Sequence, residues 1–156
     1  MELGKAQKIA NEIRALLEPL CEKLAVAGSI RRQRPVVKDI DLVMIPIDRW
    51  KLDLALMSLG KLSMSGFKLS RVTMDGGTRV DIYFATPETF ATLLLIRTGS
   101  VESNLRLCAT AKRRGWRLCA DGSGLFNEKG ERIAGDSERS IYEALGLVYQ
   151  EPGDRG

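Results

Sequence analysis

No histidine occurs among the 156 residues of the sequence. Histidine is the general base of Ser-His-Asp hydrolases and the commonest protein ligand of metal ions such as zinc. Its absence excludes imidazole catalysis and most zinc sites, and it leaves 20 aspartates and glutamates as the main groups that could move protons or bind metal ions. The sequence therefore predicts that any chemistry here depends on carboxylates.

Cysteine is also scarce. The three cysteines, Cys21, Cys108 and Cys119, form no CxxC pair. An odd number of cysteines without metal-ligand spacing predicts free thiols, which are usually buried because the side chain behaves as a small apolar group. We expect neither a disulfide framework nor a cysteine-bound metal.

Long apolar runs are missing, since none reaches the ~18 residues that a membrane-spanning helix needs. The segment 1–20 instead has the spacing of an amphipathic helix and not the pattern of a signal peptide. Its apolar positions are Ile9, Ile13, Leu16, Leu17 and Leu20. With 44% hydrophobic residues, the chain can bury a core as one compact unit or two small lobes. We therefore expect a soluble, cytoplasmic protein with no membrane partner.

Two aspartates open a run of apolar residues. Residues 38–46 read KDIDLVMIP, which predicts a buried strand that ends at Pro46. Because side chains alternate along a strand, Asp39 and Asp41 lie on the same face, about 7 Å apart. Carboxylates are the oxygen ligands that Mg²⁺ takes, and paired metal ions can activate an attacking oxygen and stabilise a leaving one. The alternative is an ordinary strand end in solvent, which the apolar residues on both faces disfavour.

A Gly-Ser turn precedes this strand. Gly28 allows the backbone to approach a ligand closely, and Ser29 could begin a short helix whose N–H groups accept an anion. Arg31 and Arg32 follow directly. Taken alone, the dipeptide fits an ordinary strand-to-helix turn in which Ser29 is the N-cap. The aspartates that follow favour phosphate binding.

Asp81 is the candidate for a third carboxylate. It lies in the segment TRVDIYF, residues 78–84, where apolar and polar residues alternate as in a strand with one polar face. Arg79 lies on that same face and could pair with Asp81. The alternative is that both residues are simply the solvent face of an antiparallel edge strand.

The chain divides into two parts by pattern. Residues 1–87 predict a helix, a strand, the Gly-Ser turn, the strand with the aspartates, a helix and two more strands, with a hairpin turn at 75–77. After Pro87 helical patterns dominate, over 88–96, 100–114 and 137–145, with a short strand pair near 116–119 and a turn at 121–124.

The net charge is +4, and residues 103–120 contain basic residues without any acid. These basic residues are Arg106, Lys112, Arg113, Arg114 and Arg117. Such a run could follow a phosphate backbone, or it could be an ordinary solvated helix face.

These motifs, in this order, resemble the palm and thumb of the family X DNA polymerases, the group that contains polymerase beta. The palm signature of the family stands here as Gly28, Ser29, Arg31, Arg32, Asp39 and Asp41, with Asp81 as the third aspartate. The thumb signature stands as Thr98, Gly99, Ser100 and Asn104, and the segment 135–152 resembles the closing segment of the family. The resemblance covers nearly the whole chain.

The resemblance implies an α+β fold class. A nucleotidyltransferase palm with a mixed β-sheet and packed helices is expected at 1–87. A small, mostly helical C-terminal thumb is expected at 88–156.

The implied function is that of a DNA-directed DNA polymerase, which adds dNTPs to a primer 3′-OH by two-metal phosphoryl transfer and fills short gaps in DNA repair. Asp39 and Asp41 would bridge two Mg²⁺ ions, with Mn²⁺ as a substitute, and Asp81 would bind the catalytic ion and take the proton of the 3′-hydroxyl. The nucleotide would contact Gly28, Ser29, Arg32, Thr98, Gly99 and Asn104. DNA would contact the basic residues Arg106, Lys112, Arg113, Arg114 and Arg117. A primer-template or gapped DNA and dNTPs are the expected partners of a monomer.

Two other functions remain open. One is a template-independent nucleotidyltransferase, or one that modifies small molecules or proteins; the thumb signature and the basic run argue against it. The other is a catalytically idle DNA-binding module that keeps the shape of a polymerase. The three intact aspartates oppose that alternative.

Overall fold

The computed structural model describes all residues, 1–156. The first part of the chain contains α1 (Leu3–Leu17), a 3-10 turn (Glu18–Leu20), β1 (Cys21–Val26), α2 (Gly28–Arg31), β2 (Ile40–Pro46), α3 (Arg49–Leu59), β3 (Gly60–Ser65), β4 (Leu69–Met74) and β5 (Arg79–Phe84). The second part contains α4 (Phe90–Thr98), α5 (Val101–Arg113), β6 (Arg117–Cys119), β7 (Gly124–Phe126), β8 (Arg132–Ala134), α6 (Glu138–Ala144) and a 3-10 turn (Pro152–Asp154). The predicted α+β class is confirmed.

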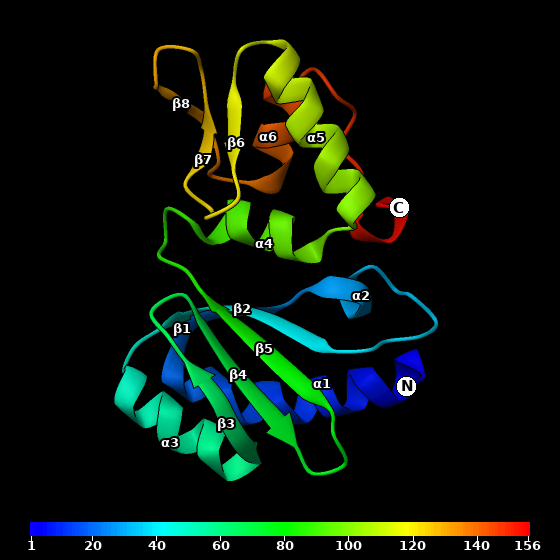
Figure 1. Ribbon diagram of the computed structural model, residues 1–156, viewed down its shortest axis with the longest axis vertical. Helices are drawn as coiled ribbons and strands as arrows, with labels where there is room; N and C mark the ends of the chain where they lie inside the picture. The colour runs from blue at the N-terminus through cyan, green and yellow to red at the C-terminus, as the bar shows by residue number, and fades with distance from the viewer.

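The larger sheet has five strands in the order β1-β2-β5-β4-β3. Only the β2–β5 pair is parallel, and the other neighbours are antiparallel, so the sheet is mixed as predicted. A smaller antiparallel sheet, β6-β7-β8, lies with α4, α5 and α6 in the upper part of the molecule (Figure 1).

The larger sheet is covered on both faces (Figure 1). On one face α1 and α3 pack against a core that includes Leu42 and Ile82, both fully buried. On the other face Val43 and Ile45 pack against residues of α4 such as Leu93. A strand buried on both faces needs a nearly continuous apolar sequence, which explains the run of residues 40–45 in β2.

The buried stripe of α1 differs in detail from the prediction. The buried positions are Ala6, Ala10, Ile13 and Leu17, spaced at helical intervals. Leu16, predicted to share this face, is 40% exposed. The two alanines were overlooked because small residues contribute little to an apolar pattern.

Two strands, and the exposure of the cysteines, differ from what the sequence predicts. The edge strand β3 and the short strand β8 carry exposed residues at most positions, so they have no apolar alternation that could reveal them. All three cysteines are free as predicted, but none is buried: Cys21 and Cys119 are half-buried and Cys108 is exposed. No helix in the structure combines the length and the apolar character that crossing a membrane requires.

Candidate active site

The register of two parallel strands brings the candidate carboxylates together. Asp41 of β2 lies directly opposite Asp81 of β5, and Asp39 immediately precedes β2. By strand alternation these aspartates share the face of the sheet on which α4 lies. The Asp81 side chain is only 5% exposed, so the solvent-face alternative for this residue is wrong.

Asp41 lies in a strongly acidic setting. Burial, followed by the charges of Asp81 and Asp39, raises the pKa of the Asp41 carboxyl to about 6, although Arg97 and Arg79 act in the opposite direction. The Asp41 carboxylate accepts no hydrogen bond that would stabilise its charge. Such a group favours either a proton or a nearby cation.

Arginines hold the other two carboxylates. Arg71 Nε donates to Asp81 Oδ1 at 2.7 Å, and Arg71 Nη2 lies 3.5 Å from Asp81 Oδ2. Arg79 Nη2 donates to Asp39 Oδ2 at 2.9 Å, while Arg79 Nε lies 3.7 Å from Asp81 Oδ2, the contact that the sequence suggested. Arg71, which faces Asp81 across the β4–β5 hairpin, was missed, although pairing outward from the turn at 75–77 would have found it.

The donor set of this face suits Mg²⁺ in its chemistry. No cluster of three or more acidic, thiol or imidazole groups is arranged as a finished metal site. Asp41 is nevertheless a carboxylate without a hydrogen-bond donor, flanked by two further carboxylates, and hard oxygen ligands of this kind are what Mg²⁺ takes.

The Gly-Ser turn lies against Asp41. The short helix α2 begins at Gly28, whose φ is 61°, and a Cβ at this position would collide with the Asp41 carboxylate. The N-cap of α2 is Ala27 and not Ser29. Glycine is therefore required here by the close approach to Asp41 as well as by the backbone conformation.

The predicted thumb signature lies at the junction of α4 and α5. Gly99 follows α4 with a φ of 71° and a cis peptide bond to Ser100, and Ser100 caps α5 by accepting from the Ser103 N–H at 3.2 Å. Asn104 Nδ2 donates to the Ile96 carbonyl at 2.9 Å, whereas its Oδ1 is buried without a partner.

The structure brings the Gly-Ser turn and the thumb signature into contact. Arg32 Nη1 donates to the Thr98 carbonyl at 2.6 Å, and the same guanidinium lies beside Gly99. Arg32 Nε is buried without a partner. Two motifs that are far apart in the sequence therefore form one site with the carboxylates.

An ion network joins α2 to the C-terminal segment. Arg31 donates to both oxygens of Glu138, at 2.8 and 2.6 Å, and to Thr98 Oγ1 at 2.8 Å. Arg155 Nη1 donates to Glu138 Oε2 at 2.7 Å, and Arg155 is fully buried. The Arg31 guanidinium is thus already bound by groups of the same chain. The sequence offered no signal for its pairing with Glu138, because the two residues are far apart in the sequence.

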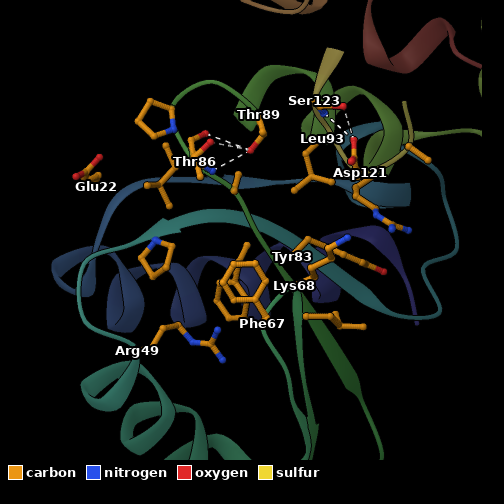
Figure 2. A pocket seen from close by; sticks show the side chains of 18 residues that line it. Glu22, Arg49, Phe67, Lys68, Tyr83, Thr86, Thr89, Leu93, Asp121 and Ser123 are labelled. Carbon is orange, nitrogen blue, oxygen red and sulfur yellow. Dashed lines mark hydrogen bonds between the residues drawn. The ribbon is translucent and has the colours of Figure 1, made fainter. Parts of the chain in front are cut away.

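The largest cleft lies beside the carboxylates and not on them. It measures about 680 Å³. Figure 2 shows Thr89, Leu93 and Asp121 on its upper wall and Phe67 and Arg49 on its lower wall. Arg97 stacks on the Tyr83 ring at 4.1 Å, and both residues line this cleft.

The predicted basic run is spread along α5 and β6. Arg106 Nη1 donates to Gln150 Oε1 at 3.3 Å, and Arg113 Nη2 donates to Thr110 Oγ1 at 3.2 Å. Arg114 donates to the Ala144 carbonyl at 3.2 Å and stacks on Trp116. In Figure 1 α5 runs away from the larger sheet, so the end of the helix that carries Arg113 is remote from the carboxylates.

Comparison with known proteins identifies the family. Residues 93–156 match the family model of the DNA polymerase beta thumb. DNA polymerase/3'-5' exonuclease PolX of Bacillus subtilis (strain 168) is 34% identical over 157 residues, which cover 96% of this chain. The chain is a family X polymerase-like protein. The aligned region is 27% of PolX, so the chain spans about a quarter of the length of that relative.

A solved structure shares the fold. Leishmania infantum polymerase beta, determined as a ternary P/T complex, superimposes with a TM-score of 0.83 over 100% of this chain and 76% of the other, at 19% identity. At this identity the comparison shows that the two proteins share a fold.

Proposed function

We propose that the chain acts as a DNA-directed DNA polymerase, in which residues 1–87 are the palm and residues 88–156 are the thumb. The observation that carries this proposal is the register that sets Asp41 beside Asp81, on the face of the sheet toward the thumb. The likeness to PolX and to a polymerase beta thumb supports nucleotidyl transfer to a primer end over other reactions of carboxylates.

Asp39 and Asp41 would hold two Mg²⁺ ions, or Mn²⁺ as a substitute, with Asp81 as a further ligand of one ion. Such ions, when bound, neutralise charge on the attacking and leaving oxygens. Asp81 takes the proton of the primer 3′-hydroxyl, a role that requires its carboxylate to be free of Arg71.

The nucleotide site would lie between α2 and the start of α5. Gly28, Ser29 and Arg32 face the phosphates, and the buried Arg32 Nε that has no partner is a donor available for this purpose. Thr98 and Gly99 border the sugar. Asn104 keeps a buried Oδ1 without a partner and one N–H, so its amide can both accept and donate at a base edge.

Primer-template or gapped DNA and dNTPs are the partners that this arrangement fits. We propose that the chain acts as a monomer and that its role is to fill short gaps in DNA repair. Short-gap filling demands few additions for each encounter, which suits a small binding surface.

A primer-extension assay tests the proposal. The chain is incubated with Mg²⁺, a labelled hairpin primer-template and the four dNTPs. A ladder that stops at the end of the template supports a DNA-directed polymerase. Untemplated tails would support a template-independent transferase instead, and a gel shift without extension would support an idle DNA-binding module.

We predict that three exposed basic residues of the thumb contribute to DNA binding through phosphates. Replacing Lys112, Arg113 or Arg117 by Ala should weaken binding equally for all DNA sequences. Each lost phosphate contact should also reduce the slope of log Kd against log salt by about one. Fluorescence anisotropy of labelled DNA from low to moderate salt measures both effects.

Arg114 provides a matched control for these variants. Its guanidinium is already engaged by the Ala144 carbonyl and the Trp116 ring. Arg114→Ala should therefore lower the thermal stability of the thumb and change the salt slope less than the other variants do. An unchanged slope in all four variants would remove α5 and β6 from the DNA-binding surface.

A further inference from the structure

We infer that Arg71 is a positioning residue that holds the Asp81 carboxylate until DNA draws the guanidinium away, and that it thereby couples metal binding to DNA binding. The inference rests on the proposed role of Asp39, Asp41 and Asp81 as metal ligands, and it adds a controlling residue to that site.

Arg71 and Asp81 form a close pair across neighbouring strands. Arg71 lies opposite Asp81 in the antiparallel β4–β5 pairing. Its Nε contacts Oδ1 at 2.7 Å and its Nη2 approaches Oδ2 at 3.5 Å, so the guanidinium fork addresses both oxygens. The Asp81 side chain is 5% exposed and that of Arg71 is 28% exposed. Arg71 therefore covers a buried carboxylate from the solvent side.

Arg71 and a metal ion compete for the same carboxylate. A guanidinium that is hydrogen-bonded to a carboxylate occupies the oxygens a metal ion needs and repels the ion by its own charge. Arg79 acts similarly on Asp39 at 2.9 Å and, more weakly, on Asp81 at 3.7 Å. Of the three aspartates, only Asp41 has no arginine bonded to it.

DNA offers Arg71 another partner. Phosphates accept the guanidinium fork in the same bidentate manner as carboxylates. Because Arg71 is partly exposed, it can turn toward a phosphate without unfolding the sheet. Asp81 would then regain its full charge for a metal ion. By linkage, metal and DNA must raise the affinity for each other by the same factor.

Mn²⁺ binding to the full chain without DNA, followed by electron paramagnetic resonance, tests the competition directly. Arg71→Ala should bind Mn²⁺ on the order of tenfold more tightly than the wild type, because one charge-assisted pair no longer has to be broken. Arg71→Gln, which keeps most of the side-chain volume, should behave in the same way if the Ala variant folds poorly. Thermal unfolding checks the fold of each variant.

Arg97→Ala is the matched control for charge. Arg97 acts electrostatically on Asp41, but it stacks on Tyr83 and bonds to none of the aspartates. Its removal should raise Mn²⁺ affinity less than Arg71→Ala does. Equal gains in the two variants, or no gain in Arg71→Ala, would overturn the inference, because the effect would then be one of net charge alone.

The coupling between metal binding and DNA binding is also measured as the effect of Mn²⁺ on the affinity for DNA. Anisotropy gives the Kd for a primer-template ended by a dideoxynucleotide, with and without Mn²⁺ at constant ionic strength. Mn²⁺ should tighten DNA binding in the wild type and do so several-fold less in Arg71→Ala. An equal enhancement in both proteins would contradict the coupling.

Failure of the proposed function gives a different result. If Arg71→Ala tightens Mn²⁺ binding but the wild type extends no primer, the polymerase proposal falls and the role of Arg71 stands. If neither the wild type nor Arg71→Ala binds Mn²⁺, or if Asp41→Asn binds it as tightly as the wild type, the aspartates are not the ligands and this inference falls.

Discussion

Replacing Asp41 or Asp81 by Asn is expected to lower kcat for nucleotide addition at least about a hundredfold, equivalent to a loss of ~2.7 kcal/mol of transition-state stabilisation. Asn keeps the shape of the side chain but removes the charge that binds a cation, and in Asp81→Asn it also removes the proton acceptor. Single-turnover extension of a primer-template with excess protein measures this loss without interference from product release.

The two variants should differ in stability. Asp41 lies near two like charges and accepts no hydrogen bond, so Asp41→Asn should leave the free energy of unfolding unchanged or raise it by relieving repulsion. Asp81→Asn leaves Arg71 with a weaker acceptor and should lower stability.

Asp75→Asn, in the exposed β4–β5 turn, is the control and should retain full activity. If Asp41→Asn or Asp81→Asn kept more than about a tenth of wild-type kcat, a loss of less than ~1.4 kcal/mol, the role assigned to that residue would be wrong.

Local alternation was sufficient to predict which face each aspartate occupies. Residues 38–46 read as one strand, and the period of two sets Asp39 and Asp41 on one side. What alternation could not predict was the contact between Asp41 and Asp81. That contact depends on a parallel pairing across a crossover that includes α3, and the register of such a pairing is set by packing between distant segments.

The same limit explains the arginines. The resemblance implies a nucleotide contact for Arg32 and none for its neighbour Arg31, and nothing in the local sequence explains that difference. Arg31 is bound by Glu138, whereas Arg32 contacts the Thr98 carbonyl and keeps a free Nε. Two adjacent residues of a helical turn point in different directions, and only tertiary contacts decide which one faces a ligand.

The edge strand β3 was not predicted, for a different reason. β3 borders the sheet and exposes most of its side chains, so its sequence is under little pressure to alternate. Most exposed positions tolerate polar residues of many kinds, and the strand is then defined by backbone pairing with β4 that no pattern of side chains reports.

Glu138→Gln is expected to lower the free energy of unfolding by about 3 kcal/mol or more. The Glu138 carboxylate is the shared partner of Arg31 and Arg155, and its side chain is 11% exposed while that of Arg155 is completely buried. A neutral amide leaves two guanidinium charges in a buried setting without a counter-charge, which is the costly half of a broken ion pair. In a chain of this size, that loss corresponds to a decrease in Tm of about 6–12 °C.

Asp136→Asn is the matched control. Asp136 pairs with Arg132 at 2.8 Å, but its side chain is 90% exposed, and such a pair contributes about 1 kcal/mol or less. Urea unfolding of the wild type and both variants at pH 7 gives the comparison. A loss in Glu138→Gln no larger than in Asp136→Asn would mean that the network contributes little to stability.

The pH dependence of the free energy of unfolding provides a second test of the network formed by Glu138, Arg31 and Arg155. Burial alone would raise the pKa of Glu138, but the hydrogen bonds and charges of Arg31 and Arg155 outweigh burial and leave this pKa below its usual value. A carboxyl whose pKa is lower in the folded than in the unfolded state stabilises the fold fully above the unfolded pKa, about 4.3 for Glu. That contribution is lost as the pH falls through the folded pKa. Because Arg31 lies on α2, loss of its ion pair with Glu138 should loosen the contact between the Gly-Ser turn and the thumb. The stability difference between the wild type and Glu138→Gln should therefore be constant from pH 7 to about 5 and shrink at lower pH.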